Sequence, residues 1–249
     1  MARGLKSFFR SLTAETPLEP AVIKIGDQAL PVAFRRNAKA KRLILRFDRS
    51  GAGLVATVPK RVSRKAALDF VERSQCWIVS RLAKQPPPAS LDGTMPVPLR
   101  GEVFRIRTTG KARGVVAADR DAMELVVPGE GAHAARRLAD WLKSEARSDL
   151  EAASLAYCQR MGLAYRRLTV RDQKSRWGSC SAAGDLSFSW RLILAPPHVL
   201  DYVAAHEVAH LKEMNHGPRF WRLVLTHCPG ARSSRDWLKK HGAEIHRYR

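Results

Sequence analysis

The sequence lacks the long apolar run of a membrane-spanning helix, and it contains few cysteines. No stretch of about 18 consecutive apolar residues occurs, so a transmembrane helix is excluded and we expect no membrane partner. The cysteines stand far apart and form no C-x-x-C pair: Cys76, Cys158, Cys180 and Cys228. A zinc knuckle or a redox pair therefore has no support, and reduced thiols favour a cytoplasmic protein.

Acidic residues are also scarce, with 23 Asp and Glu against 44 Lys and Arg, which gives a formal net charge of +21. Such an excess predicts weak, non-specific attraction to nucleic acid and other polyanions, and it says nothing about the fold. The basic residues are spread along the whole chain, which favours a solvated basic surface over a dedicated nucleic-acid interface. The dense run at 35–42 has no interleaved aromatic residues and is more typical of a charged loop than of a base-stacking strip.

The composition, 45% hydrophobic and 27% charged, is that of a globular protein with mixed secondary structure. Short β-branched or alternating segments bounded by turn residues predict strands at 21–26, 31–34, 42–47, 54–58, 104–108, 123–127, 167–171, 176–180 and 186–194. Helical spacing of apolar residues and capping signals predict helices at 63–84, 131–161, 196–214, 218–226 and 234–247. Residues 50–53 predict a hairpin turn, and the basic N-terminus predicts a frayed tail or a short amphipathic helix.

Two parts of the chain share a pattern. Leu54–Pro59 and Leu125–Pro128 both read as a strand that ends in proline, and each is followed by a helix that carries a tryptophan, Trp77 or Trp141. This similarity favours a weak internal repeat.

The sequence His206-Glu207-Val-Ala-His210 carries the strongest chemical signal. On a helical wheel the two histidines lie about 40° apart, so both imidazoles share one face. The apolar residues Leu200, Ala204, Val208 and Leu211 form the opposite stripe, and Glu207 falls between the two faces. A metal centre for hydrolysis needs this arrangement: two ligands on one face and a carboxylate beside the metal that can act as a base.

Zinc requires a third protein ligand while one coordination position stays open for water. The candidates are Glu213, His216, His227, Glu244 and His246. His216 has the offset used by zincins in which the helix breaks and the chain returns to the metal. Asn215 is expected to supply a left-handed residue for that reversal, and Gly217 with Pro218 then opens the next helix. We favour His216 over Glu244, the rival in zincins that take a glutamate from a later helix.

A set of motifs resembles the YgjP-like zinc metallopeptidases, which are related more distantly to the SprT-like and Wss-type proteases. The resemblance covers about residues 25–249 and is most specific over 176–221. It is carried by Trp177-Gly-Ser-Cys180, Ser189-Trp-Arg-Leu192, the Pro-x-x-Val-x-Asp-Tyr-Val run ending at Val203, His206-Glu-Val-Ala-His210 and Asn215-His216-x-x-x-Phe220-Trp221. The chain departs from the family at Ser189, where members usually carry asparagine; serine can still form hydrogen bonds but lacks the double role of an amide.

The resemblance implies that His206, His210 and His216 bind Zn²⁺ and that Glu207 is the catalytic acid and base. It predicts an α+β fold: a β-rich N-terminal part with helices, followed by a zincin-like metallopeptidase domain with a small sheet and the H-E-x-x-H helix. The expected organisation is a tail at 1–20, a β-rich region with a helix at 21–85, a Pro-rich linker at 86–90, strands and a long helix at 91–165, and a catalytic core at 166–249.

The expected function is zinc-dependent hydrolysis of peptide bonds, with a peptide or protein as the substrate. The strand around Trp177–Cys180 is expected near the metal helix, where its edge could receive an extended peptide. Arg191, His227 and Tyr248 stay open as groups that stabilise the oxyanion. Two alternatives remain at this point: a nucleic-acid-associated protein with a structural zinc, and an inactive zincin. The sequence indicates no oligomeric state.

Overall fold

The computed structural model describes residues 18–26, 28–48, 53–83, 89–173 and 176–248. The chain divides into two compact units, Met1–Gln85 and Pro86–Arg249. Most of the expected N-terminal tail, most of the turn at 50–53, residue 84 at the end of a predicted helix and residues 86–88 of the expected linker lie outside the described residues.

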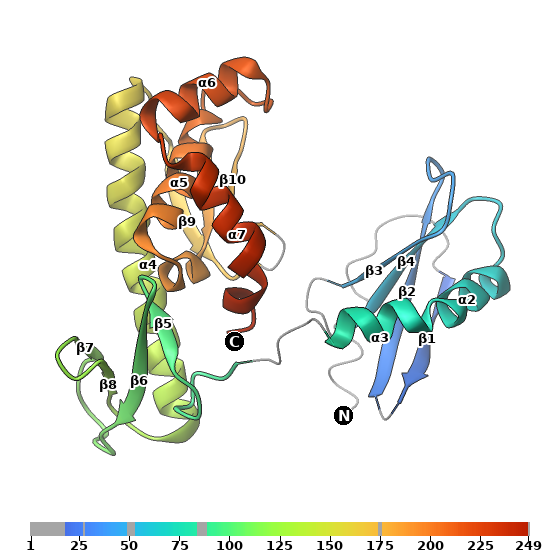
Figure 1. Ribbon diagram of the computed structural model, residues 1–249, viewed down its shortest axis with the longest axis horizontal. Coiled ribbons are helices and arrows are strands. Elements are labelled where there is room, and N and C mark those ends of the chain that lie inside the picture. Colours follow the sequence, from blue (N-terminus) through green and yellow to red (C-terminus); the bar gives the residue numbers. More distant parts are fainter. Residues whose placement is uncertain (1–17, 27, 49–52, 84–88, 174–175, 249) are drawn as a thin grey trace. The chain divides into compact units, whose positions relative to one another are not determined.

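The first unit is a four-stranded sheet with two helices (Figure 1). The sheet has the order β1-β2-β4-β3, in which β2 and β4 are parallel and the outer pairs are antiparallel. Its core is apolar and includes Val32, Leu54 and Val71. The elements are β1 (Leu18–Ile25), β2 (Gln28–Asn37), β3 (Ile44–Phe47), β4 (Leu54–Pro59), α2 (Arg64–Arg73) and α3 (Gln75–Ala83).

Ser63 caps α2 as expected, because its Oγ accepts a hydrogen bond from the backbone N–H of Ala66 at 3.1 Å. The single helix predicted over 63–84 is wrong, because the chain leaves helical geometry at Ser74. The Ser74 hydroxyl donates to the carbonyl of Phe70 at 2.7 Å, and such bonding to a carbonyl four residues back is known to bend helices.

The second unit begins with a sheet of the same design. Its strand order is β5-β6-β8-β7, with a parallel central pair and antiparallel outer pairs. The expected repeat is therefore present in the strand topology of the two sheets. Strands β5 and β7 were not predicted, because three residues are too few to establish an alternating pattern. The elements are β5 (Val97–Leu99), β6 (Glu102–Thr108), β7 (Ala117–Asp119), β8 (Glu124–Val127) and the helix α4 (Gly131–Met161).

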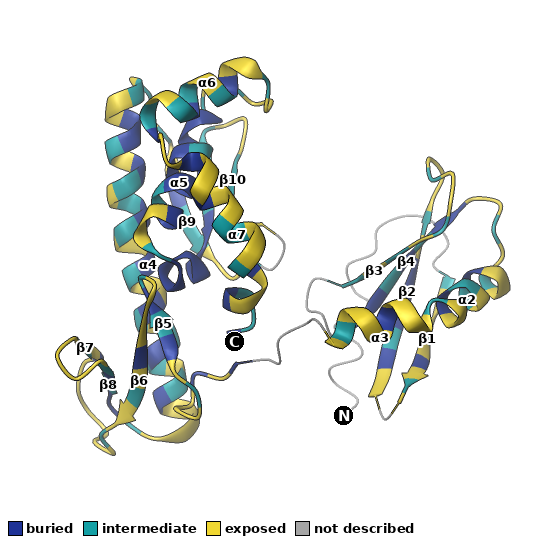
Figure 2. Cartoon of the chain, in the orientation of Figure 1, coloured by how far each residue is buried: buried dark blue, intermediate teal, exposed yellow. Residues whose placement is uncertain are grey.

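Helix α4 has 31 residues and runs along the second unit, as predicted (Figure 1). Its buried stripe repeats every four residues, from Leu138 through Leu142 and Ala146 to Leu150 (Figure 2). The helix ends at Gly162, whose φ of 65° is left-handed and suits glycine at a helix C-terminus.

Of the remaining elements, β9, η2, α5 and α6 contact α4, and α7 packs against α5 and η2. A three-stranded sheet has the order β10-β11-β9, with β9 and β11 parallel, so β10 is an edge strand. The elements are β9 (Arg167–Arg171), β10 (Gly178–Cys180), β11 (Asp185–Ser189), the 3₁₀ helix η2 (Trp190–Leu194), α5 (Pro197–Ala209), α6 (Pro218–His227) and α7 (Ala231–His246).

Two predicted elements in this region are too long. The strand predicted over 186–194 ends at Ser189, whose Oγ accepts the N–H of Arg191 and caps η2. The apolar run that follows is buried on every residue, which explains why its period does not distinguish a strand from a tight helix. The helix predicted to reach Met214 ends at Ala209.

Arg191 fastens the end of α7 to η2. Its side chain is 2% exposed; Nε and Nη2 donate to the carbonyl of Tyr248 at 3.0 and 2.8 Å, and Nη1 donates to Asp172. Tyr248 in turn donates its hydroxyl to the carbonyl of Pro96, and the N–H of Ala89 donates to the carbonyl of Arg247 at 3.0 Å. The first and last described segments of the second unit are thus bonded to each other.

The predicted α+β fold class, with a β-rich N-terminal part, is confirmed. Within the residues described, no helix has both the length and the apolar character needed to cross a membrane.

Candidate metal centre

Helix α5 carries one of the predicted site histidines, His206, and a second, His210, caps its C-terminal end. Pro197 occupies its first turn, where the missing N–H of proline is harmless. Most of the helix is buried, with Val199, Ala204 and Val208 fully enclosed. His206 and His210 follow one another along one face, and their ring centroids are 4.9 Å apart. The core packing of α5 therefore fixes the direction of both imidazoles.

The early end of α5 brings His216 back toward the helix. In the turn that follows the helix, the N–H of Glu213 donates to the carbonyl of Ala209 at 3.0 Å. The Nε2 atoms of His216 and His206 lie 3.0 Å apart. The expected left-handed Asn215 is wrong, since Arg100 and Met123 are the non-glycine residues with positive φ in the described chain. The reversal is made by a turn in which the N–H of Gly217 donates to the carbonyl of Asn215 at 2.7 Å.

Three imidazoles thus converge. One nitrogen from each of His206, His210 and His216 lies within 4.8 Å of the others, and no further histidine, cysteine or carboxylate of the described chain joins the group. The ring of Phe220 stacks on His210 at 4.5 Å and 29°, which restricts the rotation of that imidazole. The cluster combines one buried ring with one at the surface, because His210 is buried and His216 is exposed.

The rings of His206 and His210 are in the state that a metal requires. Nδ1 of His210 lies 3.0 Å from the carbonyl of Glu213; a carbonyl only accepts, so Nδ1 carries the hydrogen and Nε2 keeps its lone pair. Burial, with the neighbouring histidines His210 and His216, lowers the pKa of His206 to about 3, so this imidazole is neutral. Three imidazole nitrogens form a donor set that suits zinc and other borderline transition metals.

The other candidate ligands lie elsewhere in the described structure. The exposed carboxylate of Glu244 lies 3.2 Å from Nδ1 of His241. His246 stacks on Trp177 with ring centroids 4.0 Å apart, and His227 is not part of the cluster. Glu213 contributes its backbone carbonyl to His210 rather than its carboxylate.

Glu207 lies beside the cluster and is 6% exposed. Burial raises its pKa to about 8, and the nearby positive charge of Arg176 acts in the opposite direction. A divalent cation bound next to it would favour the carboxylate form.

Gly178 on β10 makes room for this carboxyl group. A Cβ at position 178 would lie 2.6 Å from both Cγ and Oε1 of Glu207, so only glycine fits beside the side chain in its observed position. The expected proximity of β10 to α5 is confirmed at this contact. Sequence reasoning did not single out Gly178, although the Trp-Gly-Ser motif contains it.

His206 and Glu207 open on one cavity of about 390 Å³. Its walls come from the start of β10, from α5 and from α7. The lining residues are Arg176, Trp177, Gly178, Tyr202, Val203, His206, Glu207, Arg235, Leu238 and Lys239.

A helix that presents two histidines and a buried carboxylate, with a third histidine returning after the helix ends, has the design of a zincin-type metallopeptidase centre. The chain belongs to the YgjP-like family, whose metallopeptidase domain matches residues 41–241. This match is narrower than the span of about 25–249 that the motifs indicated. No curated protein and no solved structure matches the chain. Membership implies a bound metal ion and a peptide or protein substrate.

Two of the open candidates for the oxyanion group, Arg191 and Tyr248, and the unusual Ser189 form other contacts. The guanidinium of Arg191 donates to the carbonyl of Tyr248 and to Asp172, so its role is structural. The hydroxyl of Tyr248 donates to the carbonyl of Pro96 at 3.1 Å. Ser189 caps η2 and donates its hydroxyl to the carbonyl of Gln173 at 3.5 Å.

Proposed function

We propose that the protein is a zinc-dependent peptidase in which His206, His210 and His216 hold the metal and Glu207 is the general acid and base. The observation that carries this proposal is the convergence of three imidazole nitrogens within 4.8 Å beside a buried carboxyl group. The membership in a metallopeptidase family supports the reaction class.

When bound, zinc supplies Lewis-acid polarisation of the scissile carbonyl and lowers the pKa of water toward neutrality. Glu207 accepts a proton from the attacking water and passes it to the departing amine. Its burial, which keeps bulk water away, raises the affinity of the carboxylate for that proton. Phe220 and the carbonyl of Glu213 hold the His210 ring in place during both transfers.

The substrate is an extended peptide segment. Strand β10 lies at the edge of its sheet and borders the cavity through Gly178. Backbone groups at a sheet edge can pair with an added strand, which would place a peptide bond beside Glu207 without a requirement for particular side chains.

The geometry favours this function over a structural zinc site. A structural site needs four protein ligands, and the described residues offer a group of three. The cavity next to Glu207 also suits a reacting substrate better than a closed site.

Metal analysis and peptidase assays on purified variants test the proposal. His216→Ala should lose most of the bound zinc, whereas Glu244→Ala, a matched control outside the cluster, should keep it. Glu207→Gln should keep fold and zinc while kcat falls by about 10²- to 10⁴-fold. Stoichiometric zinc in His216→Ala, or near wild-type turnover in Glu207→Gln, would contradict the assignment.

A further inference from the structure

The cavity beside Glu207 has a strongly positive rim. Arg176 precedes β10, and Arg235 and Lys239 lie one turn apart on α7, so three cations line a space in which Glu207 is the one acidic residue. Lys239 is paired with Asp236 at 3.0 Å. In the described parts of the chain, neither Arg176 nor Arg235 has a carboxylate within salt-bridge distance.

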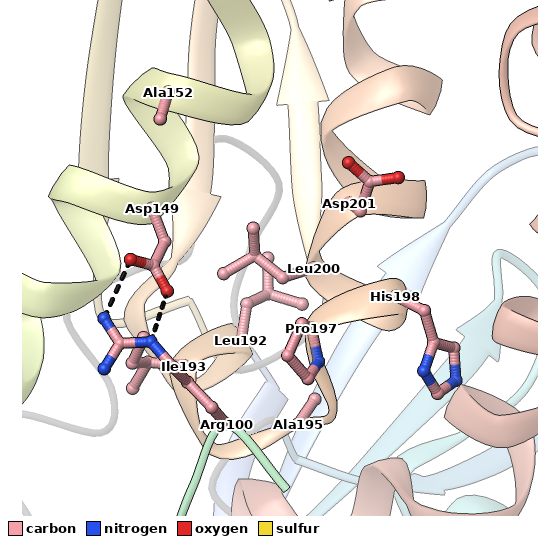
Figure 3. Close-up of a pocket in the computed structure, with 10 residues that line it drawn as sticks. All are labelled: Arg100, Asp149, Ala152, Leu192, Ile193, Ala195, Pro197, His198, Leu200 and Asp201. Carbon is pink, nitrogen blue, oxygen red and sulfur yellow. Dashed lines mark hydrogen bonds and ion pairs between the residues drawn. The ribbon is translucent and has the colours of Figure 1, made fainter. Parts of the chain in front are cut away.

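A second cavity, of about 410 Å³, is lined by an arginine whose charge is paired with carboxylates (Figure 3). It lies between α4 and the start of α5, and Arg100 lines it. There the guanidinium is already neutralised, with two bonds of 2.8 Å to Asp149 and a third to Glu145. The charge of Arg100 is thus used in ion pairs within the fold. Among the described residues, Arg176 and Arg235 form no such ion pair, although they line the cavity at the metal centre.

Both arginines border the metal centre, because they line the same cavity as His206 and Glu207. Arg235 also lies over the ring of Trp221, 5.2 Å from its centroid, a contact that holds the guanidinium near the cavity. Trp177 and Leu238 supply apolar walls between the cations.

We propose, on the basis of the peptidase function above, that this cavity is a subsite for a carboxylate of the peptide substrate. Guanidinium groups bind carboxylates through paired N–H donors, and the apolar walls would cover the aliphatic part of the same residue. The carboxylate comes either from an acidic side chain near the scissile bond or from the C-terminus of the peptide. The same chemistry serves both.

The test uses binding rather than turnover. Four alanine-based hexapeptides, with either glutamate or glutamine at one internal position and either a free or an amidated C-terminus, are titrated calorimetrically into zinc-loaded Glu207→Gln protein. We expect the peptide with the recognised carboxylate to bind more tightly than its neutral counterpart. The pair that differs identifies the source, whether side chain or C-terminus.

Arg235→Gln should reduce that preference about fivefold, as expected for an exposed charge pair, and Arg176→Gln with Arg235→Gln should abolish it. Arg232→Gln is the matched control: it removes the same charge from the same helix but does not line the cavity, and it should leave the preference unchanged. Equal binding of all four peptides, no binding of any, or an equal effect of Arg232→Gln and Arg235→Gln would overturn the proposal.

Wild-type kinetics separate this proposal from the function on which it rests. If the peptides are hydrolysed with equal KM, the carboxylate subsite fails and the peptidase survives. If binding discriminates but none of the peptides or unfolded proteins offered is cleaved, the subsite stands and the peptidase function fails. If both hold, Arg235→Gln should raise KM for the preferred peptide and leave kcat within about twofold.

Discussion

Gly178→Ala is the smallest change that tests whether the position of Glu207 matters. The glycine has no left-handed φ, so its backbone accommodates alanine without strain. The three atoms nearest to the added methyl group all belong to Glu207: Cγ and Oε1 at 2.6 Å and Cδ at 2.8 Å.

The size of the effect follows from these distances. Non-bonded carbon atoms rest about 3.5 to 4.0 Å apart, so the carboxyl group must move by about 1 Å. A misplacement of about 1 Å in a reacting group costs about 10²-fold in rate, or about 2.7 kcal/mol of transition-state stabilisation. Overpacking should also lower the free energy of unfolding by about 1–3 kcal/mol.

The assay compares kcat and zinc content of Gly178→Ala with those of Gly230→Ala, a control whose new Cβ would meet nothing nearer than Ser233 Oγ at 3.9 Å. We expect a loss of kcat in Gly178→Ala with zinc still bound, because none of the three histidines is displaced. Activity within twofold of wild type, or a loss of zinc in proportion to activity, would refute the reasoning.

Three further predictions concern stability and charge. Arg191→Met should lower the free energy of unfolding by about 2–4 kcal/mol in urea titrations, because it leaves the buried carbonyl of Tyr248 without its donors; a loss below about 1 kcal/mol would contradict this role. Burial, with the charge of Arg191, lowers the pKa of His246 from 6.5 to about 4. Between these pH values His246 takes up a proton in the unfolded chain but not in the folded one, so the free energy of unfolding falls as the pH drops from 7 to 5. His246→Phe should reduce this fall by about 1–2 kcal/mol. The net charge of +21 should give nucleic-acid binding that weakens steeply between about 50 and 200 mM salt and is alike for all sequences; salt-insensitive or sequence-selective binding would argue against it.

Local periodicity was enough to predict the part of the candidate site that lies on α5 and at its end. His206, Glu207 and His210 are separated by helical intervals, so their common placement follows from the period and from the apolar stripe opposite them. The long helix α4, predicted roughly over 131–161, has these bounds for the same reason, since its apolar residues recur at helical spacing.

The rest of the site depends on contacts between distant segments. The return of His216 was predicted by its offset from His206, but the expected left-handed Asn215 was wrong because a turn without positive φ makes the same reversal. The fit of Gly178 against Glu207 joins a strand to a helix, and no local pattern signals such a contact. The basic rim was hidden because Arg176 and Arg235 come together only through the packing of α7.

The bonding of the two ends of the second unit bears on how fast this unit folds. The hydroxyl of Tyr248 reaches a carbonyl 152 residues earlier in the chain, so a large loop must close before this contact contributes any stability. Contacts of such separation slow folding, and the docking of α7 that buries Arg191 belongs to the same closure. Linking residue 248 to residue 89 and opening the chain at an exposed turn would make this closure local. The permuted unit would then reach its native state sooner while keeping the same final contacts.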